Sequence, residues 1–439
     1  MKWKRLVQNT ILLTGTTLVM RCTAMVFQVW LVGRIGAAGI GLYQLVLSVG
    51  MLASTVAVSG IRFASTRLIA EELGLGRPES VGAAAGRCLG YALCFGTAAA
   101  ALLAFLAQDI GFLWIGDART VPSLRLLALS LPFMALSAVF CGYFTAVGRV
   151  LKSTAAQILE QLLRIAFVVV LLQQVNPENI TASCAAVTKG ATMGEALSCL
   201  VLALLYVQDR RRFRSQEGRG GEKLTGRMLG IALPLALSAY ARSSLSTLEH
   251  LLVPRQLRLS GLSSDRALEG YGSIQGMIFP ILTFPSCLLT ALAELLVPEL
   301  TAEQMRGNHR QIRRTVARLL AGSALFGLVT AAVLWIWAEP LTQKLYGDAQ
   351  LGTLLRQLCP LVPVIYLDIV TDGCLKGLGQ MLHSMLFNIL DAALGVTLVV
   401  LLLPTWALTG YIAMIYITEL GNAALSLQRL LRVIRAMGR

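Results

Sequence analysis

Two arginines interrupt apolar segments of this sequence without a local partner for their charge. Arg21 lies near the middle of the stretch LLTGTTLVMRCTAMVFQVWLVG, and Arg242 lies within a second apolar segment. Neither has an acidic residue three or four positions away. A charged side chain at the centre of a membrane helix costs about 2.5 to 3.5 kcal/mol. We therefore expect each arginine to meet an acid on another helix, water or an anionic ligand.

A guanidinium stays charged and binds phosphate through two parallel hydrogen bonds. Arg21 and Arg242 therefore indicate an anion site in a central cavity, with salt bridges between two lobes as the alternative. Arg62, in the sequence SGIRFASTR, follows another apolar segment and is expected either to join this site or to contact lipid headgroups. Glu160 and Arg164 are four residues apart, a spacing that predicts a structural ion pair on one helix face.

Acidic residues in the apolar segments suggest a place for a coupling ion. Asp372 and Lys376 have the spacing of an ion pair, whereas Asp368 lies one turn deeper and has no local partner. Asp368 either hydrogen-bonds a neighbouring helix or takes part in ion or proton coupling, because a desolvated carboxylate readily takes up a proton. Asp368, Asp372 and Glu249 are the predicted coupling residues. Further candidates are Asp391, Glu195, Glu294 and Glu419.

The residue types that form metal centres and catalytic triads are scattered. The nine cysteines form no C-x-x-C pair, and the three histidines, at positions 250, 309 and 383, are far apart in the sequence. We expect no metal site and no cofactor, apart from a coupling cation such as Na⁺ or H⁺. We also expect that the protein is not an enzyme.

The segments that hold these residues are typical of a polytopic membrane protein. The sequence is 56% apolar and 14% charged, with a mean hydropathy of +0.69, far from the usage of soluble domains. About 20 apolar residues cross a bilayer as a helix. The pattern predicts twelve spans, at 6–32, 41–61, 86–107, 122–144, 155–175, 182–207, 228–253, 271–297, 316–337, 351–375, 385–403 and 410–431.

The net charge of +15 is distributed by membrane side. With both termini in the cytoplasm, most lysines and arginines fall on the inside, which follows the positive-inside rule. The charge therefore requires no nucleic acid partner. The densest basic run, DRRRFRSQEGRGGEK at 209–223, is expected to be a solvated cytoplasmic linker, with binding of anionic lipid as the alternative.

The two halves of the sequence resemble each other. Residues 142–172 align without a gap to residues 373–403, at a constant offset of 231, and the matches include Gly142 with Gly373 and Gly148 with Gly379. For the first helix of each half an offset of 221 aligns Arg21 with Arg242. The sequence thus predicts two parallel six-helix repeats. Their boundaries are an N-terminal lobe at 1–208, a basic linker at 209–226 and a C-terminal lobe at 227–439.

Several stretches carry a resemblance to a known family, among them GRIGAAGIGLYQLVLSV (33–49), SGIRFASTRLIAEEL (59–73), LTFPSCLLTALAELLVPEL (282–300) and CLKGLGQ (374–380). In their order and spacing they resemble the polysaccharide transporter branch of the multidrug/oligosaccharidyl-lipid/polysaccharide (MOP) exporter superfamily. The resemblance implies a V-shaped, MATE-like fold with a central cavity lined by spans 1, 2, 7 and 8. Related lipid II flippases bind pyrophosphate with cavity arginines, and Arg21, Arg62 and Arg242 lie in comparable helices.

The resemblance implies a flippase that moves undecaprenyl-diphosphate-linked saccharide, a peptidoglycan precursor or another envelope or spore-cortex unit, to the outer leaflet. The expected partners are this lipid-linked oligosaccharide and membrane lipids, in a monomeric, multi-pass protein of the bacterial plasma membrane. The main alternative is a cation-coupled multidrug exporter of the MATE type, because Glu249, Asp368 and Asp372 leave its acidic pattern open. A membrane glycosyltransferase and a non-transporting assembly scaffold are further alternatives.

Overall fold

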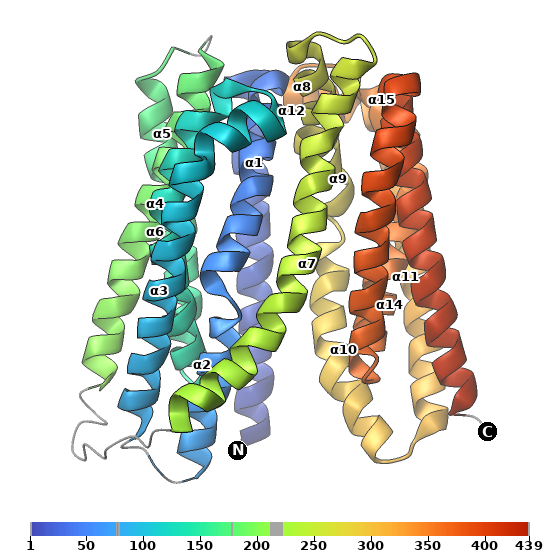
Figure 1. Ribbon diagram of the computed structural model, residues 1–439. Coiled ribbons are helices and arrows are strands. Elements are labelled where there is room, and N and C mark those ends of the chain that lie inside the picture. Colours follow the sequence, from blue (N-terminus) through green and yellow to red (C-terminus); the bar gives the residue numbers. More distant parts are fainter. Residues whose placement is uncertain (1, 76, 78–79, 177–178, 211–222, 438–439) are drawn as a thin grey trace. The chain divides into compact units, whose positions relative to one another are not determined.

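The computed structural model describes residues 2–75, 77, 80–176, 179–210 and 223–437, and these residues are almost entirely helical, with no strand among them. The predicted linker at 209–226 lies largely outside the described residues. The helices are α1 (Lys2–Val58), α2 (Ile61–Gly74), α3 (Ser80–Asp109), α4 (Val121–Ala146), α5 (Val150–Gln173), α6 (Ile180–Arg210), α7 (Lys223–Leu259), α8 (Ser264–Gly272), α9 (Phe279–Thr283), α10 (Cys287–Met305), α11 (His309–Ile336), α12 (Ala338–Tyr346), α13 (Leu351–Leu358), α14 (Val362–Gly377) and α15 (Met381–Ala436) (Figure 1).

The described helices confirm an all-α polytopic membrane protein. Nine of them are long and apolar enough to cross a membrane, and a bent pair, 264–283 with 287–293, makes a tenth. This pair bends by 62°, at a break that contains Pro285 and where the helical hydrogen bonds are interrupted. The count of twelve spans stays a prediction.

Two helices are much longer than a bilayer requires. α1 has 57 residues, about 85 Å at a rise of about 1.5 Å per residue, against a hydrocarbon core of about 30 Å. Its backbone leaves the helical region at Gly36 (φ 70°, ψ 175°), between the predicted spans 6–32 and 41–61. α15 breaks in the same way at Ala407 (φ 49°, ψ −127°), between the predicted spans 385–403 and 410–431. Each helix therefore has room for two crossings.

The chain forms two compact units. Unit 1 consists of Met1–Gly41 with Leu252–Arg439, and unit 2 consists of Leu42–Leu251. This division differs from the predicted lobes, because residues 1–41 group with the C-terminal part of the chain and most of α7 groups with the N-terminal part. Both α1 and α7 are thus shared between the units.

Unit 2 is held together by close helix contacts and by hydrogen bonds along α7. α5 and α6 approach closely because Gly190 and Gly194 have no side chain; a Cβ at Gly194 would lie 2.9 Å from the backbone nitrogen of Arg164. α7 is joined to the second half of α1 by a bond from the Thr247 hydroxyl to the Ser48 carbonyl, at 2.9 Å. This bond attaches α7 to α1 within unit 2.

Unit 1 joins the first segment of α1 to the bent helix pair. A Cβ at Gly272 would lie 2.2 Å from the carbonyl oxygen of Ala37, so only glycine fits there. The Gln28 amide donates to the carbonyl of Gly276, at 3.0 Å. α12 is attached through Tyr346, whose hydroxyl donates to the Met277 carbonyl at 3.1 Å. Burial raises the pKa of this phenol, so it remains a donor.

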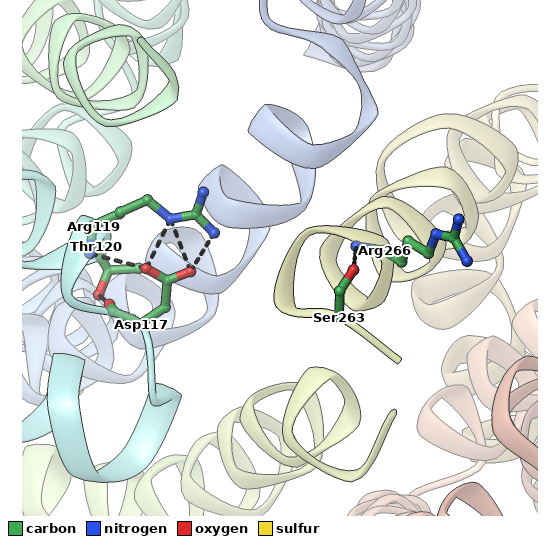
Figure 2. Close-up of polar contacts among 5 residues, drawn as sticks. All are labelled: Asp117, Arg119, Thr120, Ser263 and Arg266. Carbon is green, nitrogen blue, oxygen red and sulfur yellow. Dashed lines mark hydrogen bonds and ion pairs between the residues drawn. The ribbon is translucent and has the colours of Figure 1, made fainter. Parts of the chain in front are cut away.

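Two short polar caps begin helical segments in connections that the sequence predicts to lie outside the membrane (Figure 2). In unit 2 the Asp117 carboxylate accepts from the backbone nitrogen of Arg119 at 3.0 Å and from its guanidinium at 2.8 Å. In unit 1 the Ser263 hydroxyl accepts from the backbone nitrogen of Arg266 at 3.4 Å, while the Arg266 guanidinium points away from it. Such side chains satisfy the free amides of a helix start.

Candidate functional site

Arg62 and Arg242 lie close to the same polar junction of unit 2. α2 begins after Ser59 and Gly60, and the Ser59 hydroxyl is 2.6 Å from the hydroxyl of Tyr240 on α7. Arg62 follows this junction by three residues, and Arg242 follows Tyr240 by two. Both arginine side chains are exposed. The structure therefore presents two exposed guanidiniums on neighbouring elements of unit 2.

Arg21 lies on the first segment of α1, in unit 1, and it is also exposed. Within the described part of the chain no carboxylate forms an ion pair with Arg21, Arg62 or Arg242, although ion pairs are numerous elsewhere. Because Arg21 and Arg242 belong to different units, their meeting at one cavity stays a prediction. Each of the three guanidiniums can accept an anion without first breaking a salt bridge.

Glu160 and Arg164 form an ion pair on α5, with 2.5 Å between the Glu160 Oε1 and an Arg164 terminal nitrogen. Glu195 on α6, which is 7% exposed, interacts electrostatically with both of them and accepts a hydrogen bond from Ser137 at 3.0 Å. The sequence predicts the pair on α5 but does not place Glu195 beside it. The structural role of the pair stays a prediction.

A cluster of acidic and amide side chains lies between α14 and α15 in unit 1, and we call it the acid cluster. It consists of Asp368 on α14 with Asp391, Glu419 and Asn422 on α15. The Asn422 amide donates to Asp368 at 3.0 Å, and Glu419 lies within electrostatic range of both aspartates. Among the described residues no side chain or backbone group donates a hydrogen bond to the buried atoms Asp368 Oδ1, Asp391 Oδ1 and Asn422 Oδ1.

Buried acceptor oxygens without donors are costly unless a proton or cation reaches them. The acid cluster is therefore a place where protons can be taken up. Asp372 lies one turn from Asp368, and both of its oxygens already have partners. It forms an ion pair with Lys376 at 2.5 Å and accepts a hydrogen bond from the Ser384 hydroxyl. Glu249 lies on α7 in unit 2, and the side chain of Glu294 lies outside the described residues.

The sequence alone brings out Asp368 as a buried acid but does not show its neighbours. Asn422 is missed altogether, since an asparagine near the end of a long apolar helix has no distinctive pattern. The one available signal is the spacing of Glu419 and Asn422, three residues apart and thus on one helix face. In the described residues no group of three or more His, Cys, Asp or Glu side chains is placed to hold a metal ion.

Comparison with known proteins is consistent with the fold. Residues 6–261 match the family described as Polysaccharide biosynthesis protein. Stage V sporulation protein B of Bacillus subtilis is 23% identical over 88% of this chain and 75% of its own length. Sporulation protein YkvU of the same organism is 22% identical over 88% of this chain and 85% of its own.

Among solved structures, the inward-facing conformation of a multidrug resistance MATE family transporter of the MOP superfamily matches with a TM-score of 0.73. The match covers 96% of this chain and 95% of that one, at 15% sequence identity. The fold is therefore that of the MATE transporters, as expected from the sequence. At this identity the likeness concerns the fold and leaves the transported molecule open.

Proposed function

Because the chain belongs to the polysaccharide biosynthesis protein family, we propose that it flips an undecaprenyl-diphosphate-linked saccharide across the bacterial plasma membrane. The saccharide moves from the inner to the outer leaflet by alternating access of two compact units. In this proposal both termini lie in the cytoplasm and the protein performs no covalent chemistry. The named relatives are sporulation proteins, which supports a peptidoglycan or other spore-envelope unit as the cargo.

The observation that carries this proposal is the set of exposed guanidiniums without ion pairs, Arg21, Arg62 and Arg242. An anionic pyrophosphate that enters a low-dielectric region needs cationic partners, since an uncompensated charge there is strongly disfavoured. A guanidinium supplies both the charge and two parallel donors. The proposed repeat aligns Arg21 with Arg242, and each of the two units thus contains one such guanidinium.

Of the two expected coupling cations, Na⁺ and H⁺, we assign H⁺ to the acid cluster. Its three buried oxygens without donors support this role, because a proton or cation would satisfy them. Release of the cation would restore the charge of Asp368 and its neighbours. This charge change would then favour a different packing of α14 against α15.

The direct test is flipping of fluorescent lipid II in proteoliposomes. We expect Arg21→Ala and Arg242→Ala each to slow flipping about ten- to a hundredfold, because one charged hydrogen-bonded contact contributes about 1.5 to 3 kcal/mol. Arg21→Lys and Arg242→Lys should retain part of the flipping rate, since lysine keeps the positive charge but lacks the two parallel donors of a guanidinium. Arg435→Ala, which removes an exposed arginine near the end of α15, is the matched control. Unchanged flipping in both alanine variants would refute the anion site.

A cation-coupled multidrug exporter is the second candidate, and the acid cluster is the observation that favours it. An exporter of cationic drugs should expel such drugs from cells, and Asp368→Asn should abolish the efflux. Arg21→Ala should then leave efflux unchanged or increase it, since removal of a positive charge weakens repulsion of the drug. The same variant slows flipping under the first proposal, so the sign of its effect separates the two functions.

A further inference from the structure

Unit 2 contains a cavity of about 160 Å³ that borders the charged residues of α5 and α6. Its walls come from the second segment of α1 and from α4, α5 and α6, and two charged side chains, Arg164 and Glu195, line it. None of the arginines proposed for the pyrophosphate lines this cavity. Its lining residues therefore differ from the arginines of that site and from the residues of the acid cluster.

Three of the hydroxyl groups that line the cavity use their hydrogens on helix carbonyls. Ser54, Ser130 and Thr192 each donate to a carbonyl three or four residues earlier on the same helix, at 3.0, 2.7 and 2.9 Å. Because each of these hydroxyl hydrogens is already used, the oxygen is left as an acceptor. Together with the Tyr43 phenol, these hydroxyls give the cavity a polar lining.

The charges beside the cavity do not cancel. Arg164 is one cation, whereas Glu160 and Glu195 are two carboxylates that interact with each other and with Arg164. Glu195 is buried and Glu160 is partly buried, and two carboxylates that share such a site do not both ionise readily, because their repulsion is poorly screened. One guanidinium neutralises one of them, and the second carboxylate is left to be neutralised by a proton.

The other titratable groups near this site supply no second cation. Tyr43 on α1 interacts with Arg164, Cys199 on α6 interacts with Glu195, and Cys141 on α4 interacts with Cys199. Lys189, two turns before Glu195 on α6, is exposed. Among the described residues around Glu195, Arg164 is therefore the cation that balances the carboxylates. The hydroxyl of Ser137 stabilises Glu195 without changing the charge.

We propose that Glu160 and Glu195 share one exchangeable proton, with Arg164 as the fixed counter-charge, and that the cavity connects this pair to solvent. On release the O–H bond of the carboxyl breaks, its electron pair stays on the carboxylate oxygen, and the proton passes to solvent. Only the use of this proton to drive transport rests on the proposed function; the binding of the proton does not. It gives unit 2 a proton site of its own.

Infrared spectroscopy of the purified protein in bilayers tests proton binding without transport. During a pH titration, the wild type should show a protonated-carboxyl carbonyl band that disappears as the pH rises. Glu160→Gln and Glu195→Gln should each remove this band, because the remaining carboxylate then pairs with Arg164. Arg164→Gln should shift its disappearance to higher pH, since the counter-charge is lost. The acid cluster is unchanged in these variants, so its bands cancel when each variant's spectrum is subtracted from that of the wild type.

Glu339→Gln is the matched control, since Glu339 forms an exposed ion pair with Arg356 and its loss should leave the band unchanged. Glu195→Asp keeps an acid at the site, so the band should remain and its disappearance should move to a different pH. This variant shows whether loss of the band in Glu195→Gln comes from the missing acid or from a folding defect. A band that survives in either Glu160→Gln or Glu195→Gln would overturn the shared proton. A band that behaves as expected in a protein that flips no lipid-linked saccharide would instead refute only the proposed function.

Discussion

Buried charges in this protein are compensated to different degrees, and the difference separates structural from functional residues. Asp209, at the end of α6, is 2% exposed and interacts with Arg149, Lys152 and the hydroxyl of Tyr143. Asp368, by contrast, accepts from the Asn422 amide at one oxygen, and among the described residues its buried Oδ1 has no donor. The first arrangement fixes helix ends, and the second leaves room for a proton.

We expect Asp209→Ala to destabilise unit 2 by about 1 to 3 kcal/mol, because it removes a buried carboxylate that pairs with two partly exposed cations and accepts from the Tyr143 hydroxyl. The melting temperature in detergent should fall accordingly. Glu339→Ala removes an exposed ion pair, with a side chain that is 54% exposed, and should cost less than about 1 kcal/mol. Equal effects of the two substitutions would contradict this account of Asp209.

Asp368→Asn should abolish the dependence of flipping on the cation gradient, because it removes the charge while retaining a side chain of the same shape. Counterflow of labelled substrate without a gradient should persist, since it requires substrate binding but no coupling. The control is Glu303→Gln, which alters an acid paired with the exposed Arg306. Intact gradient dependence in Asp368→Asn would exclude the acid cluster from coupling.

At the scale of elements, glycines allow helices to approach and to end at positions that the predicted repeat aligns. A Cβ at Gly142 on α4 would lie 2.7 Å from the carbonyl oxygen of Arg62 on α2, and one at Gly373 on α14 would lie 2.7 Å from the Ala293 side chain on α10. Gly148 and Gly379, which follow the same helices, have φ values of 74° and 72°, a conformation that favours glycine.

Gly142→Ala should push α2 away from α4 and destabilise the protein by about 1 to 3 kcal/mol, the usual range for overpacking. It should also slow flipping, because Arg62 lies at the contact. Gly86→Ala on α3 is the control, since nothing lies within 4 Å of its new Cβ and alanine favours a helix. A melting temperature of Gly142→Ala equal to or above that of Gly86→Ala would argue against this close approach.

At the scale of the whole molecule, the testable property is topology. The described start of α1 and the end of α15 lie at the same end of unit 1 (Figure 1), as an even number of crossings requires. In a cysteine-free background, Ser263→Cys should react with an impermeant maleimide added outside intact cells. Arg310→Cys should react only after the membrane is opened. The reverse pattern would invert the proposed direction of transport.

Several properties follow from the sequence alone. Its hydropathy determines a polytopic helical protein, and its isolated charges mark Arg21, Arg62, Arg242 and Asp368 as residues that need a partner. These conclusions depend on local quantities, namely the transfer cost of each side chain and the three- and four-residue spacings on one helix face.

Tertiary structure decides which charges meet. Asp391, Glu419 and Asn422 join Asp368 only because α15 breaks at Ala407 and packs against α14, and Glu195 joins Glu160 only because glycines bring α6 against α5. Residues far apart in the sequence have no periodic relation, so spacing cannot reveal such groups. The division of α1 and α7 between two units has the same origin, because it depends on packing between helices rather than on the order of the spans.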